Sequence, residues 1–503
     1  MKARFWIFLK KPLKAGGRLV WRTVFWGDGP AATQKSDIRN MNALAADLLT
    51  ALQNLLGETH VLTQNLEAFG RDETEDLLYL PQLVVQPGTA EEVAAVLALC
   101  NRFEVPVTTR GAGTGLSGGA LPVKGGVVLA TGRLNRIIDI DTQNLQATLE
   151  PGVVTQVFQE AVQAHGLFYP PDPSSRGSCF IGGNLAESAG GPRAVKYGTT
   201  KDYVLNLQVA LPSGELLWTG ANVLKNATGY NLTQLLVGSE GTLGVITKVV
   251  FRLLPYPQQN VLLLVPFHSL EGACAAVSAV FRAGITPSAM EFMEREAIVW
   301  AAEYLKIPLD LPAEVQAHLL IELDGQQLEP LYAEAEKLYE VLSTFDCGEI
   351  LLADTAEQKE QLWKLRRNVA YAVKANSVYK EEDTVVPRAY LPQIIAKVKE
   401  VGAKYGFQSV CYGHAGDGNV HVNIIRGALS EHDWEQTVKL GIREIFEEVQ
   451  RLGGTISGEH GIGLVQQPYM DIVMQPVHLE LMRGIKKVFD PKGILNPGKI
   501  MDL

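Results

Sequence analysis

The glycine-rich stretch Arg110-Gly-Ala-Gly-Thr-Gly-Leu-Ser-Gly-Gly119 decides how the first half of this chain is interpreted. It comes directly after a pattern that is typical of a βαβ unit. Residues 83–85 and 105–109 are short apolar runs that predict strands, and a helix is predicted at 90–103 between them. The residues Thr89-Ala-Glu-Glu92 have the spacing of a capping box, which indicates where this helix begins. The sequence therefore predicts that a strand leads the chain into the glycine-rich loop.

Gly113, Gly115 and Gly118 fit the GxGxxG spacing of dinucleotide-binding folds. That motif requires a helix immediately after it, because the helix N-terminus holds the pyrophosphate. Residues 119–126 contain three glycines and a proline, which are poor helix formers, so the context argues against that fold. Two interpretations remain. The loop either presents successive backbone amides to phosphate, with Arg110 adding charge, or has a structural role only.

Two more segments rich in glycine and other small residues follow, at 170–191 and 238–247. Small residues allow a backbone to approach a ligand closely. Three such segments, well separated along the chain, therefore indicate a backbone that contacts one long ligand along its length.

The remaining pattern predicts an α+β protein of more than one domain. Further strands are predicted at 126–130, 136–141, 146–149, 204–210 and 245–253. Pro255 and Pro257 mark a boundary, after which strands alternate with long helices. The predicted helices include 37–56, 269–283, 330–344, 356–375 and 435–452.

Composition excludes several classes of protein. The 503 residues include 45 Lys and Arg against 55 Asp and Glu, a net charge of −10, which disfavours nucleic-acid binding because phosphate neutralisation needs a basic surface. The five cysteines form no CxxC pair, so zinc ribbons and disulfide scaffolds are disfavoured and a reducing, cytoplasmic location is expected. No run of about 18 apolar residues predicts a membrane-spanning helix.

The first 26 residues differ from the rest of the chain. They contain seven basic residues and no acidic one, interleaved with six tryptophans and phenylalanines. This combination is typical of peripheral contact with a membrane, here the inner face of the cell membrane. The alternative is an extension that packs on the protein or on a partner.

Two histidines lie in the stretch Tyr412-Gly-His414-Ala-Gly-Asp-Gly-Asn-Val-His421-Val-Asn423. On one straight strand, an offset of seven residues would place them on opposite faces. Residues 416–419, Gly-Asp-Gly-Asn, are a strong turn signal, and a turn can bring both imidazoles together. After the turn, Asn419, His421 and Asn423 are expected to share one face of a strand.

A third ligand for a metal is available in Ser457-Gly-Glu459-His460-Gly-Ile-Gly463. His414, His421 and Glu459 form a set of two histidines and a carboxylate, which suits Zn²⁺ first, with Fe²⁺ and Mn²⁺ as alternatives. Such a set leaves coordination positions open for a substrate. The other interpretation is that these histidines are structural groups that form hydrogen bonds around glycine turns.

These blocks together resemble the flavin-binding oxidoreductases of the vanillyl-alcohol-oxidase type, in the branch of D-lactate dehydrogenases, D-2-hydroxyglutarate dehydrogenases and glycolate oxidase flavin subunits. The resemblance runs from about residue 80 to the C-terminus. It implies an FAD-binding domain of two subdomains and an α+β substrate-cap domain. No histidine lies between residues 61 and 164, where some relatives attach flavin covalently, so non-covalent FAD is expected. The cofactor-binding residues that the resemblance implies are Arg110, Gly111, Ala112, Gly113, Thr114, Gly115, Ser117, Gly118, Pro171, Ser178, Gly182, Gly183, Asn184, Gly190, Gly191, Glu240, Gly241, Gly244, Val245, Ile246 and, near the flavin ring, Asn496.

The resemblance also implies an activity, the oxidation of a D-2-hydroxy acid such as lactate, glycolate or 2-hydroxyglutarate. It assigns the same metal ligands as the residue pattern, His460 as the base, and Arg366 as the group that binds the substrate carboxylate. Arg367 competes for that role, and either arginine could instead lie on a solvated helix face. The segment Lys380-Glu-Glu-Asp383 departs in spacing from the family's lysine in this region, which leaves the substrate open.

The expected domains are an N-terminal extension with a helix at 1–58, an FAD domain at 59–257, a cap domain with the metal site at 258–465, and a C-terminal segment at 466–503 that returns to the FAD domain. The electron acceptor is expected to be a quinone, a cytochrome or an electron-transfer flavoprotein. A homodimer and a multi-subunit complex both stay open. The alternatives to an active dehydrogenase are a flavin subunit without independent turnover and a metal-dependent hydrolase whose glycine blocks are structural.

Overall fold

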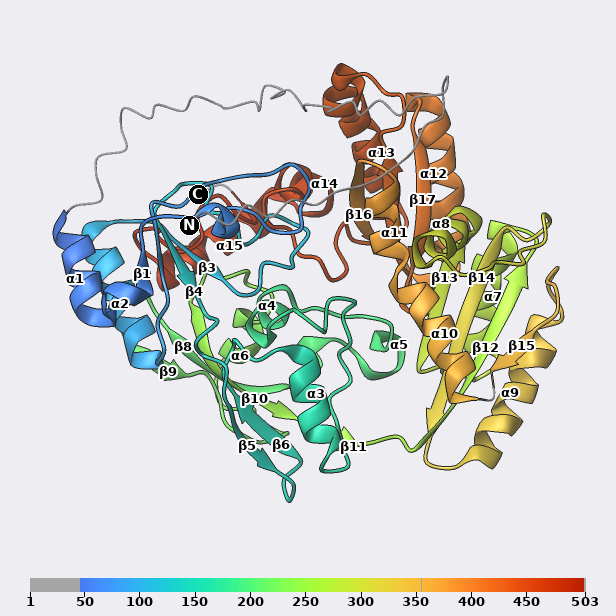
Figure 1. Ribbon diagram of the computed structural model, residues 1–503, viewed down its shortest axis with the longest axis horizontal. Helices are drawn as coiled ribbons and strands as arrows, with labels where there is room; N and C mark the ends of the chain where they lie inside the picture. The colour runs from blue at the N-terminus through green and yellow to red at the C-terminus, as the bar shows by residue number, and fades with distance from the viewer. Residues whose placement is uncertain (1–45, 354, 502–503) are drawn as a thin grey trace, which may run out of the picture. The chain divides into compact units, whose positions relative to one another are not determined.

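The computed structural model describes residues 46–353 and 355–501 (Figure 1). The basic segment 1–26 and the start of the helix predicted from residue 37 lie outside these residues, so membrane contact stays a prediction. Among the described residues, no helix is both long enough and apolar enough to cross a membrane. The described residues form three sheets of four or more strands.

The first glycine-rich loop leaves the edge of a four-stranded sheet. In spatial order, the strands are β1 (Val61–Leu62), β2 (Leu83–Val85), β4 (Val127–Ala130) and β3 (Val107–Arg110). Both β2 and β3 run parallel to β4, and helix α2 (Ala90–Phe103) spans the predicted range. Thr89 caps α2 by accepting a hydrogen bond from the backbone N–H of Glu92. No helix forms between β3 and β4, as the glycine and proline content there predicted.

The third glycine-rich segment, 238–247, leads into the central strand of a second sheet, which has five antiparallel strands. In spatial order, its strands are β5 (Ile137–Asp141), β6 (Gln146–Leu149), β10 (Val245–Arg252), β8 (Val204–Ala210) and β9 (Leu216–Trp218). An apolar core that includes Phe158, Tyr169 and Phe251 lies against this sheet. The helices that contribute to this core or lie beside it are α3 (Thr155–Gln163), α4 (Ile181–Glu187), α5 (Ala194–Tyr197), α6 (Leu232–Leu236) and α15 (Pro476–Phe489). A short pair, β7 (Leu167–Phe168) and β11 (Leu254–Pro255), completes this part, and α1 (Ala46–Leu56) packs on α2.

The third sheet has seven strands, all of them antiparallel. In spatial order, its strands are β15 (Leu351–Ala353), β12 (Gln259–Phe267), β14 (Ala317–Gly325), β13 (Ala289–Glu294), β17 (Gln408–Gly413), β18 (Asn419–Ile425) and β16 (Tyr379–Val385). Alternate residues of a strand face opposite sides. In β12, Val261 and Leu263 join one apolar core, whereas Leu262 joins another. The sheet is therefore buried on both faces.

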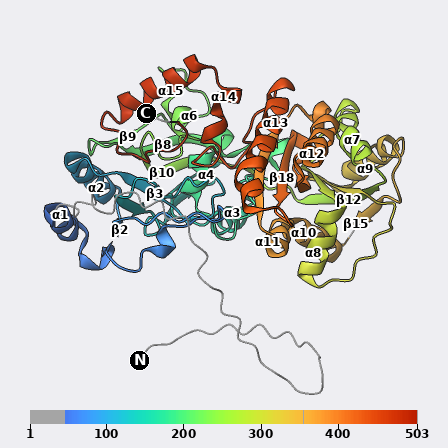
Figure 2. The same cartoon turned by 90° about the horizontal axis from the view of Figure 1, so that it is seen from above.

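Helices cover both faces of this sheet, as Figure 2 shows from above. On one face lie α7 (Leu270–Arg282), α9 (Leu328–Leu342), α12 (Leu391–Tyr405) and α13 (Val438–Arg451). On the other lie α8 (Arg295–Leu305), α10 (Ala356–Arg367) and α11 (Val369–Asn376). The prediction of one helix at 356–375 was wrong. The chain leaves helical geometry at Asn368, whose ψ is 1° and whose side chain donates to the carbonyl of Lys364.

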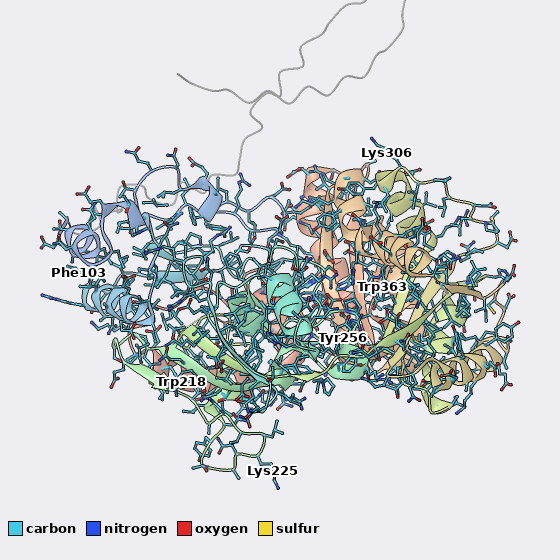
Figure 3. The ribbon with its side chains drawn as sticks, turned by 60° about the horizontal axis from the view of Figure 1, so that its bottom comes forward. Phe103, Trp218, Lys225, Tyr256, Lys306 and Trp363 are labelled. Atoms are coloured by element: carbon cyan, nitrogen blue, oxygen red, sulfur yellow. The ribbon has the colours of Figure 1, made fainter. Side chains whose placement is uncertain are left out.

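The chain after α13 runs back to the first sheet (Figure 1). It contains α14 (Met470–Val473) and α15, and its last part pairs with β3 through a parallel bridge between Val107 and Leu495. We propose a domain boundary at about residues 257–258, between β11 and β12. Tyr256 lies at this junction (Figure 3), and its carbonyl accepts a hydrogen bond from the Gln326 side chain of the seven-stranded sheet's unit.

Candidate functional site

One cavity of about 330 Å³ brings the glycine blocks and the histidine motifs together. His421, Glu459, His460 and Arg366 all contribute to its wall. The wall also contains most of the residues predicted to bind a cofactor, namely Gly111, Ala112, Gly113, Thr114, Gly115, Ser178, Gly182, Gly183, Asn184, Glu240, Gly241, Gly244, Val245 and Ile246. Segments separated by more than 300 residues therefore face the same space.

Several predicted residues lie behind the wall instead of in it. Arg110 folds beneath its own loop, where Nη2 donates to the carbonyl of Ala68 at 3.1 Å. Gly113 makes room for this guanidinium, since an added Cβ would lie 2.0 Å from Nη2. Asn496 donates to the carbonyls of Gly119 at 3.0 Å and of Glu240 at 2.7 Å, so it ties two glycine blocks together. The other residues predicted for the site but outside the wall are Ser117, Gly118, Pro171, Gly190, Gly191 and His414.

The cavity wall has open space beside glycines, which have no side chain to fill it. Ideal Cβ atoms built on Gly115 and Gly183 would meet no atom within 4 Å. The hydroxyl of Thr109, also in the wall, is buried without a hydrogen-bond partner. Glu240 and Gly241 have successive positive φ angles of 50° and 69°, a backbone form that turns amides toward one side. The wall is therefore suited to an extended polar ligand that binds along the backbone.

The turn predicted between the two histidines is present and brings their rings together. Strand β17 ends at Gly413, a short 3-10 turn covers Ala415–Asp417, and β18 returns antiparallel. The ring centroids of His414 and His421 lie 5.3 Å apart. On β18, both side-chain polar atoms of Asn423 are buried without a partner.

Glu459 joins these histidines from a loop beside strand β16. Its Oε1 lies 3.1 Å from Nε2 of His414 and 3.6 Å from Nε2 of His421. The loop is held by Asp383, whose Oδ2 accepts hydrogen bonds from the backbone N–H groups of Gly458, Glu459 and His460, each within 2.9 Å. His414, His421 and Glu459 thus offer donor atoms that all lie within 4.8 Å of one another.

A buried carboxylate links this cluster to Arg366. Glu291 of β13 is fully buried, and its two oxygens lie 2.8 Å and 2.9 Å from Nδ1 of His414. Its Oε2 also lies 2.6 Å from Nη2 of Arg366. Arg367, also in the cavity wall, pairs with Asp172 at 3.3 Å.

The pKa values of the two histidines in the cluster shift in opposite directions. Burial and the nearby His460 lower the pKa of His421 to about 3, so its imidazole is neutral. Burial also disfavours a charged His414, but Glu291 and Glu459 outweigh this effect and raise its pKa well above the usual value. Burial would raise the pKa of Glu459, yet the neighbouring histidines lower it to about 2. The carboxylates of Glu291 and Glu459 therefore favour a positively charged group at this point.

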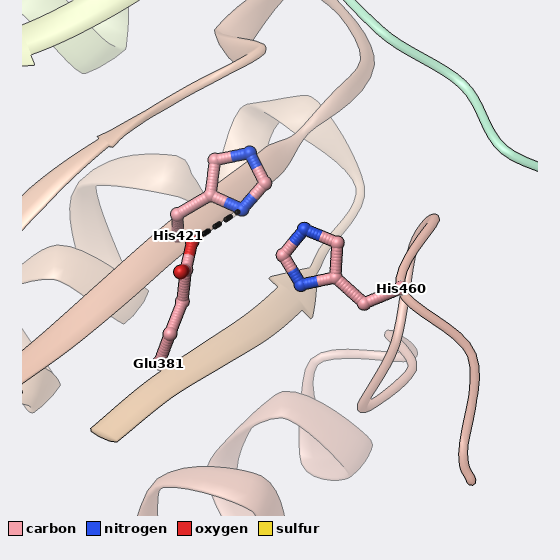
Figure 4. Close-up of side chains that lie close together, drawn as sticks. All are labelled: Glu381, His421 and His460. Carbon is pink, nitrogen blue, oxygen red and sulfur yellow. Dashed lines mark ion pairs between the residues drawn. The ribbon is translucent and has the colours of Figure 1, made fainter. Parts of the chain in front are cut away.

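The pKa of His460 is also raised. Burial lowers it, but the carboxylates of Asp383 and Glu381 have the larger combined effect. His460 stacks on His421 with 5.1 Å between ring centroids, and Figure 4 shows both rings beside Glu381. Its Nδ1 lies 3.9 Å from Oδ2 of Asp383.

Sequence reasoning missed two carboxylates that organise this site. Asp383 holds the Glu459 loop, and Glu291 orients His414. Glu240, which was predicted to bind the cofactor, also accepts hydrogen bonds from the backbone N–H groups of Ile462 and Gly463. A signal was present for Glu291, because an acidic residue inside the apolar run Ala289–Glu294 requires a partner when buried. The partners themselves lie more than 70 residues away in each case.

Comparisons with known proteins agree with this arrangement. Residues 81–220 match the family described as "FAD binding domain", and residues 256–500 match "FAD linked oxidases, C-terminal domain". The chain is 38% identical over 435 residues to the glycolate oxidase subunit GlcD of Bacillus subtilis (strain 168), which covers 86% of this chain and 91% of that protein. It is 38% identical over 425 residues to a D-lactate dehydrogenase of Anaerostipes hadrus, with coverage of 84% and 89%.

The fold also matches a solved structure of p-cresol methylhydroxylase with substrate bound. The TM-score is 0.75 at 20% identity, over 91% of this chain and 97% of that one. This likeness supports the fold alone, which is of the vanillyl-alcohol-oxidase type with an FAD-binding part and a cap. Given the two matched families and the relatives that span most of its length, the chain belongs to the family of FAD-linked oxidases and is an FAD-linked oxidoreductase of the glycolate oxidase and D-lactate dehydrogenase branch.

Proposed function

We propose that this protein oxidises a D-2-hydroxy acid to the 2-oxo acid with non-covalently bound FAD and one divalent metal ion. The observation that supports this most is the single cavity that contains the glycine blocks, His421, Glu459, His460 and Arg366. A metal-dependent hydrolase needs no flavin-binding site beside its metal, so that alternative does not suit the family.

The glycine blocks fit FAD. The open space at Gly115 and Gly183 and the unpartnered hydroxyl of Thr109 leave both room and polarity for a dinucleotide. The histidines in the cavity wall, His421 and His460, belong to the cap side and not to these blocks, which supports non-covalent binding. When bound, FAD supplies a hydride acceptor.

The cluster of His414, His421 and Glu459 fits a divalent metal. Two ligand atoms about 2.1 Å from a tetrahedral zinc ion lie roughly 3.4 Å apart. The distances of 3.1 Å and 3.6 Å from Glu459 to the histidine nitrogens are on either side of this value. Glu291 at Nδ1 of His414 leaves Nε2 for the metal, as partners of metal-binding histidines do. A metal here would lower the pKa of a coordinated hydroxyl group.

The chain's own residues then have distinct roles. Arg366 lies in the wall with its Nε buried and without a hydrogen-bond partner, and it binds the substrate carboxylate. Asp383 lies on the Nδ1 side of His460, which leaves Nε2 to take the hydroxyl proton. Both arginines are ion-paired, but Arg366 is linked through Glu291 to the metal cluster, which favours Arg366 over Arg367 for the carboxylate.

Reduction of the bound flavin by substrate tests the proposed function directly. Under anaerobic conditions, a D-2-hydroxy acid is expected to remove the flavin's visible absorbance, and the L-enantiomer is expected to be far slower. Preincubation with a chelator is expected to suppress the reduction while FAD stays bound. Equal rates of flavin reduction with the D- and L-acids, unchanged by the chelator, would contradict the proposal.

Glu291→Gln tests whether Glu291 orients the metal ligand. Loss of its charge weakens the hydrogen bond that fixes His414, so metal affinity is expected to fall roughly 10–100-fold. Competition with a chromophoric chelator measures this affinity without any turnover. Glu294→Gln is the matched control, because Glu294 is an equally buried acid on the same strand that pairs with Lys399 instead. Equal metal affinities in the two variants would contradict the role of Glu291.

The electrons are proposed to pass to a quinone, a cytochrome or an electron-transfer flavoprotein. The basic segment 1–26 would suit delivery at the inner face of the membrane. One relative is named as a subunit of glycolate oxidase, which supports the alternative that this chain works within a multi-subunit complex. Turnover of the isolated chain with an artificial dye distinguishes the two cases.

A further inference from the structure

We propose that Glu381 selects the substrate class and makes this site specific for 2-hydroxy acids that carry a single carboxylate, against those with a second one. This inference rests on the proposed function and concerns its open question, the identity of the acid. It is argued from the position of Glu381, from the absence of any short hydrogen bond to it among the described residues, and from the pairing of each Lys and Arg that the described part of the cavity wall contains.

Glu381 faces the reacting end of the cavity. It lies in the middle of β16, on the same face as Tyr379 and Asp383, and it lines the cavity with His421, Glu459 and His460. Oε1 lies 3.6 Å from Nδ1 of His421 (Figure 4). A group bound between His460 and the metal cluster is therefore close to this carboxylate.

The neighbouring acids on β16 make short hydrogen bonds that hold other groups in place, whereas Glu381 does not. Asp383 accepts three backbone hydrogen bonds from the Glu459 loop and one from the Asn419 side chain. Glu382 points to the other face and accepts a hydrogen bond from Gln466 at 2.7 Å. The hydrogen bond that Glu381 accepts among the described residues is a long one, from the Tyr412 hydroxyl to Oε1 at 3.4 Å. Its other oxygen stays available to a ligand.

The cavity wall has no unpaired Lys or Arg for a second carboxylate. Among the described residues, its basic residues of these two types are Arg366, Arg367 and Lys374. Arg366 pairs with Glu291 at 2.6 Å, Arg367 with Asp172 at 3.3 Å, and Lys374 with Glu73 at 2.5 Å. One substrate carboxylate can use Arg366 and the metal. A second carboxylate would meet Glu381, and like charges at short range repel.

The part of the substrate beyond C2 is therefore uncharged, and it can include a hydroxyl group that donates a hydrogen bond. Tyr379 and Tyr412 in the wall offer apolar ring surface, and Oε2 of Glu381 can accept a hydrogen bond from a hydroxyl group. Small monocarboxylic acids of the lactate type meet these conditions, and dicarboxylic acids of the 2-hydroxyglutarate type do not.

The test compares D-lactate with D-2-hydroxyglutarate in anaerobic flavin reduction by the FAD- and metal-loaded full chain. The wild type is expected to favour D-lactate at least 100-fold in kcat/KM, and Glu381→Gln to shrink this preference about 10-fold by improving the diacid. Titration of the oxidised flavin spectrum with pyruvate and 2-oxoglutarate checks binding without turnover, and only the diacid is expected to bind tighter to the variant. Glu382→Gln is the matched control, one residue away on the opposite face, and should leave both ratios unchanged.

The possible outcomes separate this inference from the proposed function. Equal use of both acids by the wild type, or an unchanged preference in Glu381→Gln, would overturn the role of Glu381 alone. Loss of metal from Glu381→Gln but not from Glu382→Gln would also overturn it, because Glu381 would then be a metal ligand. A flavin that no hydroxy acid reduces would overturn the proposed function and this inference with it.

Discussion

Replacement of His460 by asparagine is expected to slow reduction of the bound flavin by substrate by roughly 10²–10⁴-fold, the usual contribution of a positioned general base. Asparagine keeps the size and polarity of the side chain but cannot take a proton. FAD is expected to remain bound, because His460 belongs to the loop held by Asp383 and not to the glycine blocks. Rapid mixing under anaerobic conditions measures the rate of reduction directly.

His268→Asn serves as the control for this variant. His268 pairs with Asp346 at 2.7 Å and is not among the residues of the cavity wall, so its replacement should leave the reduction rate unchanged. A normal rate in His460→Asn would remove His460 from the mechanism. The proton would then have to leave through another group, and the metal cluster would be the remaining candidate for activating the hydroxyl.

Glu459→Gln is expected to have an effect of similar size by a different route. Loss of the carboxylate leaves two histidines, and a Lewis acid that acidifies a bound hydroxyl contributes several kcal/mol, so flavin reduction should slow at least roughly 10²-fold. The purified variant is expected to contain much less metal than the wild type. Elemental analysis measures the metal content, and the flavin spectrum shows whether FAD is retained.

Metal repletion distinguishes a lost ligand from a lost fold. Chelator-treated wild type should regain flavin reduction when Zn²⁺, Fe²⁺ or Mn²⁺ is restored, whereas Glu459→Gln should not. The ion that restores the highest rate also identifies the metal. Full activity of the metal-free wild type would contradict the metal-assisted mechanism and would leave Glu459 as a hydrogen-bond partner of His414.

Features that depend on near neighbours in the chain were predicted well. Helix α2 and strands β6 and β8 have the predicted bounds, because capping residues and alternation act over a few residues. The absence of a helix after the first glycine block was predicted for the same reason. The turn between His414 and His421 was predicted from four residues, and the structure shows the close rings that such a turn allows.

Features that depend on tertiary contacts were not predicted from the sequence. The spacing of buried residues in α10 continues into α11, so the periodicity of the sequence alone does not reveal the break between the two helices. The sequence did not reveal that Arg110 lies beneath its loop, where the space under Gly113 admits the guanidinium. It also did not reveal that Asn496 binds two carbonyls behind the cavity wall; the position of Asn496 near the flavin ring stays a prediction.

The order of residues along the chain was enough to identify the glycine blocks, the histidine turn and the family, since backbone freedom and turn formation are local properties. Tertiary structure alone decided which groups stand next to which. It placed Glu291 between His414 and Arg366, tied the Glu459 loop to Asp383, and left Glu381 open to the cavity. These partners are distant in the chain, and a buried charge is stable only beside an opposite charge or a hydrogen-bond donor. Which group stands beside it depends on how the sheets pack, and no short stretch of sequence encodes that packing.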